Sequence, residues 1–573
     1  MFALVLVFLW YPSCDYKKNR FGLLFDLTLL ILSISAISYL FINHDYVLDR
    51  FAYVDDLLPA DLLLGTALIL TTLEATRRVI GLALPLTALA FLAYALGIDQ
   101  IGFGELIDQM YLTTEGIFGI PLNVSATYMV LFILFGALVE HSGTGKLFRD
   151  FSLALAGSSA GGPAKVACVT SAMFGTVSGS STANVMTTGT FTIPMMKKIG
   201  YRPAFAGAVE AVASTGGQIM PPIMGAAAFV MAEFMAVSYL TVVSIAIVPA
   251  ILYFVAVFCA VHFEAKRMGL KGLPKPDLPR LGEVVKTRGH QFLPLAVIVG
   301  VLVSGYSPPY AALCGLLSVL PVALLGRTTR RDISWRTVYD SIITGIRNTL
   351  IVAGACASAG IVIGVIAQTA VGIEFTQLIS SGFSDGNIVL ALLLTAVAGI
   401  LLGMGLPTTP AYIVQAALLA PALVNLGIAR EAAHLFVFYY AILSVITPPV
   451  AISLYAANGL SGAGLWESGI AAVKLAATGY IIPFMFVFGP PLLLVGSWSN
   501  IAWAVITALM GVVCLASSLH GYLLSPINFL LRVVLFSGSL ALITPGLVSD
   551  MFGLILLTVL LLQQKFSNRF FAN

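Results

Sequence analysis

Four segments of this chain place glycine, proline and hydroxyl residues inside long apolar stretches. Two of them, Gly175–Asn184 and Gly403–Pro410, read GTVSGSSTAN and GMGLPTTP. The other two, Ser214–Pro222 and Ser444–Pro449, each end in a Pro-Pro pair. Glycine and proline interrupt a helix and leave backbone N–H and C=O groups without partners. Such groups, together with hydroxyls, can bind a small ion or a polar substrate.

The freed groups predict two kinds of ligand. A half-helix N-terminus carries partial positive charge and free N–H groups, which suit a carboxylate, whereas freed carbonyl and hydroxyl oxygens suit a small cation such as Na⁺. The expected substrate-binding residues are Ser178, Ser180, Ser181, Thr182, Asn184, Pro407, Thr408 and Thr409. The expected cation-binding residues are Gly175, Thr176, Gly216, Gly217, Pro221, Pro222, Gly403, Gly405, Thr447, Pro448 and Pro449. For any one hydroxyl, helix packing or a bond to its own helix backbone is an equal alternative.

Glu210 is a candidate of another kind, because it lies midway along the apolar segment 203–220. An acidic group inside a membrane is costly and points by default to function. We expect Glu210 to carry a proton or to neutralise a cation, the alternatives being a helix cap or an ion pair with a basic residue. Glu140 and His141 stand at the end of an apolar segment and are expected to face the membrane interface.

Composition shows what kind of protein must position these residues. Of 573 residues, 59% are hydrophobic and 10% are charged, against about 25% charged in an average soluble domain. The mean hydropathy is +0.99, which excludes both a soluble enzyme and a disordered chain. Roughly sixteen apolar segments approach the length of a membrane span. The sequence therefore predicts an all-α polytopic membrane protein.

Other chemistry finds little support in the sequence. The cysteines are scattered without metal-ligand spacing, so neither a disulfide nor a bound metal beyond Na⁺ is expected. A phosphate-binding motif of the type G-x-x-x-x-G-K-[ST] is absent, which argues against direct use of ATP. A membrane-embedded enzyme with Ser180 or Ser181 as nucleophile would need a base, and the interrupted segments contain no histidine.

Two parts of the chain match at one constant offset. Pro194 and Pro421 are 227 positions apart, and the same offset relates Gly200 to Gly427 and the pair at 221–222 to the pair at 448–449. We therefore expect a repeat over about 125–235 and 352–462, called here the first copy and the second copy. The apolar pieces 185–196 and 411–424 are too short to span a membrane, so each is expected to be one arm of a re-entrant hairpin.

Charge predicts the orientation of the two copies. The first copy carries Lys197, Lys198 and Arg202 in a loop where the second copy has Arg430 beside Glu431. Basic loops face the cytoplasm, so the copies are expected to have opposite orientations, a plan shared by many secondary transporters. A duplication without inversion is the alternative.

Several longer motifs carry a family resemblance. They are TEGIFGIPL (114–122), GGPAKVA (161–167), FTIPMMKKIGYRPAFAGAVEA (191–211), ASTGGQIMPPIMGAAAF (213–229) and GMGLPTTPAYI (403–413). The chain resembles the membrane component of tripartite ATP-independent periplasmic (TRAP) transporters, and most of all the fused form in which small and large membrane subunits share one chain. That form usually works with a periplasmic binding protein of the TAXI type.

The resemblance implies a multi-pass protein of the bacterial inner membrane with no cofactor. It would be a symporter that imports a small organic acid, such as a dicarboxylate like 2-oxoglutarate or an amino acid like glutamate, with Na⁺ or H⁺. Residues 1–100 would be small-subunit scaffold helices, 101–490 the large subunit and 491–573 additional helices. The large subunit would work as an elevator with two hairpins in a monomeric component. A self-sufficient carrier or a channel without a binding protein is the alternative.

Overall fold

Helices account for every regular element that the structure describes. The computed structural model describes residues 1–14, 20–326, 328–331, 333–379 and 387–570. Eight helices in these ranges are long and apolar enough to cross a membrane. The predicted all-α polytopic membrane protein is thereby confirmed. The number of full spans is smaller than the number of apolar segments, because several segments form hairpin arms or half-helices.

The first copy folds into a hairpin followed by a broken helix. Its helices are α8 (Val130–Val139), α9 (Gly145–Ala156), α10 (Gly162–Ser178), α11 (Ser181–Lys198), α12 (Pro203–Gly216), α13 (Ala227–Met235) and α14 (Tyr239–Arg267). Helices α10 and α11 are the arms of the hairpin, since only Gly179 and Ser180 separate them. Pro203 begins α12, where its missing N–H leaves no bond unmade.

The second copy repeats these elements at the offset of the sequence. Its helices are α18 (Trp335–Gln368), α19 (Val371–Gln377), α20 (Ile388–Gly403), α21 (Thr408–Asn425), α22 (Arg430–Ser444), α23 (Ile452–Ser461) and α24 (Leu465–Phe488). Both ends of α11 map onto the ends of α21. Local backbone geometry repeats as well, because the Pro-Pro bonds are cis in both copies and positive φ angles recur at Met224 and Ala451.

The two broken helices, α12–α13 and α22–α23, run in opposite directions. Near the start of α12, Gly207 lies against Ser461 at the end of α23. Near the start of α22, the ring of His434 lies 6.4 Å from that of Phe234 at the end of α13. Each residue of the first contact is the offset partner of a residue in the second contact, as at a self-complementary two-fold interface. The copies therefore have the antiparallel relation of an inverted repeat.

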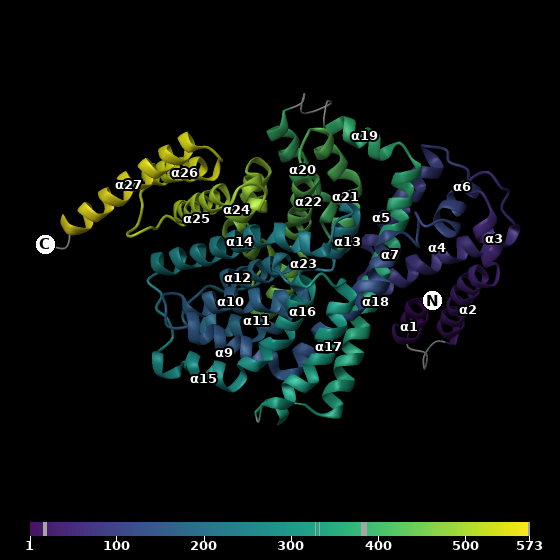
Figure 1. Ribbon diagram of the computed structural model, residues 1–573, viewed down its shortest axis with the longest axis horizontal. Coiled ribbons are helices and arrows are strands. Elements are labelled where there is room, and N and C mark those ends of the chain that lie inside the picture. The colour runs from purple at the N-terminus through teal and green to yellow at the C-terminus, as the bar shows by residue number, and fades with distance from the viewer. Residues whose placement is uncertain (15–19, 327, 332, 380–386, 571–573) are drawn as a thin grey trace.

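Further helices flank this repeat at opposite ends of the molecule (Figure 1). At one end α1 (Phe2–Trp10), α2 (Arg20–Ile42), α4 (Pro59–Ile80) and α5 (Ala83–Gly97) gather beside α18. At the other end lie α25 (Trp498–His520), α26 (Phe529–Ile543) and α27 (Leu547–Phe570). The division of the chain at residues 100 and 490 stays a prediction.

Polar contacts hold both sets of flanking helices in place. The hydroxyl of Thr76 on α4 lies 2.7 Å from that of Ser358 on α18. On the opposite side, His520 Nδ1 of α25 lies 2.9 Å from Glu264 Oε2 of α14. Bonds between buried polar groups fix the relative placement of helices, because a lost partner leaves a desolvated group unsatisfied.

Candidate functional site

The first hairpin turns at a tip made of Ser178, Gly179 and Ser180. Gly179 adopts φ +60°, a left-handed conformation that suits glycine. Ser180 then caps α11, because its Oγ accepts a hydrogen bond of 3.3 Å from the backbone N–H of Ala183. The tip therefore presents hydroxyls at the N-terminus of an 18-residue helix.

The second hairpin reaches an equivalent tip with different residues. Helix α20 ends at Gly403, Gly405 turns the chain at φ +81°, and Pro407 precedes α21. Thr408 and Thr409 occupy the first turn of α21, which again has 18 residues. Both tips thus direct a helix N-terminus and hydroxyl groups toward the same region.

The two tips line a single cavity of about 230 Å³. The first tip contributes Ser178, Gly179, Ser180, Ser181, Thr182 and Ala183, and the second contributes Pro407, Thr408 and Thr409. Further lining residues come from α8, such as Phe132 and Gly136, and from α18, such as Asn348 and Ile351. Among the described residues that line this cavity, Glu140 alone carries a charge. The predicted substrate-binding residues therefore converge, with the exception of Asn184.

Asn184 lies deeper in the hairpin than the other predicted substrate ligands. Its side chain is 1% exposed, and its Nδ2 donates a hydrogen bond of 3.0 Å to the carbonyl of Ser171 on α10. The amide therefore joins the two arms of the hairpin. Ser181 is also engaged, because its Oγ lies 2.6 Å from Ser453 Oγ at the start of α23.

Three of the predicted cation-binding residues, Gly175, Gly217 and Gly403, lie at close contacts beside the tips, and the contact of Gly175 with Gly217 is between two backbones. A Cβ atom on Gly175 would lie 2.2 Å from the Cα of Gly217, so α10 and the segment after α12 touch backbone to backbone. In the second copy, a Cβ on Gly403 would meet Ser444 Oγ at 2.4 Å. Thr447 instead uses its hydroxyl within the protein, donating to Leu443 O at 2.7 Å and contacting the hydroxyl of Tyr480 at 2.7 Å. Cation binding at these residues stays a prediction.

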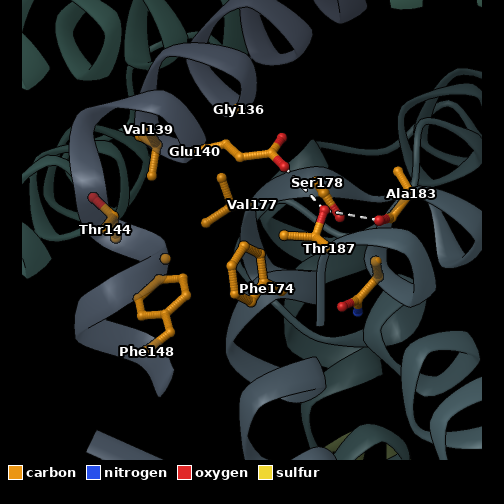
Figure 2. A pocket seen from close by; sticks show the side chains of 12 residues that line it. Gly136, Val139, Glu140, Thr144, Phe148, Phe174, Val177, Ser178, Ala183 and Thr187 are labelled. Carbon is orange, nitrogen blue, oxygen red and sulfur yellow. Dashed lines mark hydrogen bonds between the residues drawn. The ribbon is translucent and has the colours of Figure 1, made fainter. Parts of the chain in front are cut away.

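Glu140 is half-buried and faces the hairpin, a contact that the sequence did not predict, while its place at the membrane interface stays a prediction. Glu140 begins a π-helical turn, Glu140–Thr144, that follows α8. Its Oε1 accepts a hydrogen bond of 2.9 Å from Thr187 Oγ1 on α11. Figure 2 shows this carboxylate turned toward Thr187 across a small pocket that also borders Phe174 and Ser178. A π-helical turn frequently marks a functional position, but a sequence pattern does not reveal it.

Glu210 lies in the interior of the protein, as its place in an apolar segment predicted. Its side chain is fully buried on α12 and contacts only hydroxyl groups among its described hydrogen-bond partners, which are Ser171, Thr188, Thr192 and Ser214. The alternative of an ion pair with a basic residue finds no support among the described residues, since each of these partners is neutral.

The chain is similar to a family of known proteins. Residues 67–501 match the family described as "Tripartite ATP-independent periplasmic transporter, DctM component". The chain is 24% identical over 335 residues to the C4-dicarboxylate TRAP transporter large permease protein DctM of Pseudomonas aeruginosa, covering 58% of this chain and 76% of that one. It is 23% identical over 380 residues to the sialic acid TRAP transporter large permease protein SiaM of Vibrio cholerae, covering 66% and 84%.

A further relative has a different length. The chain is 22% identical over 350 residues to the isethionate TRAP transporter permease protein DctMQ of Oleidesulfovibrio alaskensis, covering 60% of this chain and 54% of the relative. The similarity thus spans about half the length of that protein.

The contact between Gly175 and Gly217 gives a prediction about stability. Replacing Gly175 with alanine should destabilise the protein by about 1–3 kcal/mol, because the new methyl group meets backbone that must shift. Gly459 on α23 is a matched control, since nothing lies within 4 Å of the position that a Cβ atom would take there and alanine favours a helix. Thermal unfolding of the detergent-purified variants measures both effects. A Gly175→Ala protein as stable as the wild type would contradict the crossing.

Proposed function

The chain belongs to the family of the DctM component of tripartite ATP-independent periplasmic (TRAP) transporters, and from this premise we propose how it works. It is a multi-pass protein of the bacterial inner membrane and a transporter component, not an enzyme. We propose that it imports a small organic acid together with Na⁺ or H⁺. In this proposal a periplasmic binding protein of the TAXI type delivers the substrate, and the two hairpins carry it across the membrane in an elevator movement.

One observation carries the proposal, namely that both hairpin tips line the same cavity. The N-termini of α11 and α21 border this cavity, and helix N-termini favour anions. Ser180, Thr182 and Thr408 line the cavity, and their hydroxyls can donate hydrogen bonds to a carboxylate. The site therefore suits a small acid whose charge is met by helix dipoles and hydroxyls.

The charge balance of the cavity supports coupling to a cation. Glu140 is the one charged group among the described lining residues, and an acidic neighbour repels an anionic substrate. A cation that enters with the substrate would offset both negative charges. The membrane potential also demands cations, because 100 mV opposes the entry of each negative charge by about 2.3 kcal/mol. A dicarboxylate would need more than two monovalent cations before the potential favoured its import.

The position of the cavity supports an elevator movement. The cavity is lined by the two tips and also by residues of α8 and α18. The substrate would therefore sit at a boundary between a hairpin unit and a scaffold. Movement of the hairpin unit along this boundary would expose the same site to either side of the membrane in turn.

The flanking helices support a fused small subunit. The family match begins at residue 67, so α1 and α2 lie outside it, and both helices pack near α4 on the side of α18.

The relatives are named for C4-dicarboxylate, sialic acid and isethionate, all of them anions. We propose that the substrate of this chain is likewise an organic anion.

Uptake into proteoliposomes tests the function. Labelled small organic acids should accumulate only when a TAXI-type binding protein is present outside and an inward gradient of Na⁺ or H⁺ is imposed. Separate Na⁺, proton and electrical gradients identify the coupling ion. Accumulation without the binding protein would replace the tripartite mechanism by a self-sufficient carrier, and equilibration without accumulation would replace it by a channel.

The hairpin tips give a prediction for each copy. Thr182→Val and Thr409→Val should each lower uptake at least tenfold, because each removes a hydroxyl from the cavity while keeping the side-chain shape. Thr190→Val is the matched control, since Thr190 lies on the exposed face of α11 and bonds only its own helix. Monodispersity and thermal unfolding check folding. Normal uptake by both tip variants would contradict the assignment of the tips.

A further inference from the structure

The surroundings of Glu210 contain more hydrogen-bond acceptors than hydrogens. Thr192 has a single hydroxyl hydrogen, yet its Oγ1 lies against both the Thr188 carbonyl, at 2.9 Å, and the Glu210 carboxylate. Thr188 has the same conflict, because its Oγ1 lies 2.7 Å from the Asn184 carbonyl and also contacts Glu210. One hydroxyl donates one hydrogen bond. An ionised Glu210 would therefore leave oxygen atoms in contact without a hydrogen between them.

Two further hydroxyls complete the cluster around the carboxylate. Ser171 Oγ and Ser214 Oγ each lie 3.3 Å from Glu210 Oε1 and 3.4 Å from one another. These separations exceed the usual range of about 2.5–3.0 Å for an O–H···O bond. Two oxygens at right angles about an ion, each roughly 2.3–2.6 Å away as for Ca²⁺, are about 3.3–3.7 Å apart. Na⁺ has nearly the same radius, so the spacing suits a shared cation.

The second copy shows that the hairpin does not need this cluster in order to fold. At the offset, Glu210 corresponds to Val437. Its partners Ser171, Thr192 and Ser214 correspond to Ala398, Leu419 and Ala441, and its fourth partner Thr188 corresponds to Gln415. Helices α20–α22 nevertheless have the same arrangement as α10–α12. Burying a carboxylate costs free energy, and helices α20–α22 form the same arrangement without a carboxylate at this position. The cluster is therefore not explained by structure alone.

Packing around the carboxylate is adapted to it. A Cβ on Gly189 of α11 would approach Glu210 Cγ to 3.2 Å, so the glycine leaves room for the acidic side chain. The cluster also adjoins the pocket of Figure 2, because Asn184 lines that pocket and accepts from Thr188 at 3.3 Å through its Oδ1. That pocket has a volume of about 10 Å³, close to the space of one water molecule.

We propose that Glu210 and its four hydroxyl partners form a buried site for one coupling cation, present in the first hairpin unit only. The cation is either a proton on the carboxylate or a Na⁺ ion among the oxygens. A proton adds one of the missing hydrogens, a Na⁺ ion binds oxygens that lack one, and either one neutralises the buried charge. The site adjoins the crossing of Gly175 with Gly217, because a Cβ on Gly217 would lie 3.0 Å from the carbonyl oxygen of Ser171. Its role in coupling rests on the proposed function, whereas cation binding itself does not.

Equilibrium binding on the purified full-length protein in detergent tests the site without substrate or binding protein. One arm measures bound radioactive ²²Na⁺ per protein; the other records the infrared band of a protonated carboxyl group as a function of pH. We expect Glu210→Gln to lower the number of bound Na⁺ ions by one, or to remove a protonated-carboxyl band that is present in the wild type. A Glu210→Gln protein that does neither would overturn the proposal.

Two conservative variants on α11, Thr192→Val and Thr190→Val, test the site even if the Glu210→Gln protein misfolds. Thr192→Val should weaken Na⁺ binding roughly tenfold or more, or move the carboxyl titration to higher pH, because the ionised carboxylate loses a donor. Thr190→Val, on the exposed face of the same helix, should leave both readouts unchanged. Equal behaviour of the two threonine variants would also overturn the site. Since transport is not measured, failure of uptake and failure of this site remain distinguishable.

Discussion

The need to satisfy backbone groups inside the membrane shapes the whole of this structure. A helix interrupted at membrane depth leaves N–H and C=O groups that lipid cannot bind, so it persists only inside protein or beside a polar cavity. This chain interrupts four of its segments, at the two hairpin tips and at the two cis Pro-Pro pairs. The two tips share one cavity, and the crossing of Gly175 with Gly217 brings backbone onto backbone beside it.

The repeat makes the two hairpins comparable, and their differences carry the chemistry. Both tips present hydroxyls at a helix N-terminus, Ser180 as a cap in one and Thr408 in the first turn of the other. Behind the tips the copies diverge, because one encloses Glu210 with hydroxyls whereas the other has the buried Val437 at the equivalent position. An inverted pair of hairpins can thus share a substrate while only one of them holds a buried charge. Such a division of roles fits a transporter in which ion and substrate move as one unit.

The sequence predicted those features that follow from residue type and spacing. The constant offset located the repeat, and the ends of α11 and α21 coincide at that offset, because glycine and proline fix where these helices break. The burial of Glu210 also followed from its place in an apolar segment. The contact of Glu140 with Thr187 was not predicted, because it joins the end of α8 to α11, two segments far apart in the sequence. Asn184 was assigned to the substrate because it belongs to the tip motif, but its rotation on α11 directs it to Ser171. Such directions depend on tertiary packing.

The two hairpin tips, in the proposed mechanism, enclose one substrate site that faces each side of the membrane in turn. Labelling of a single cysteine at Thr409, in a protein whose six native cysteines have been replaced, tests this directly. A membrane-impermeant thiol reagent should label this cysteine in right-side-out vesicles and also in inside-out vesicles. When the protein is trapped in one state, the cysteine should be labelled in one of the two vesicle preparations and protected in the other. Labelling from the same side under all conditions would contradict alternating access at this site.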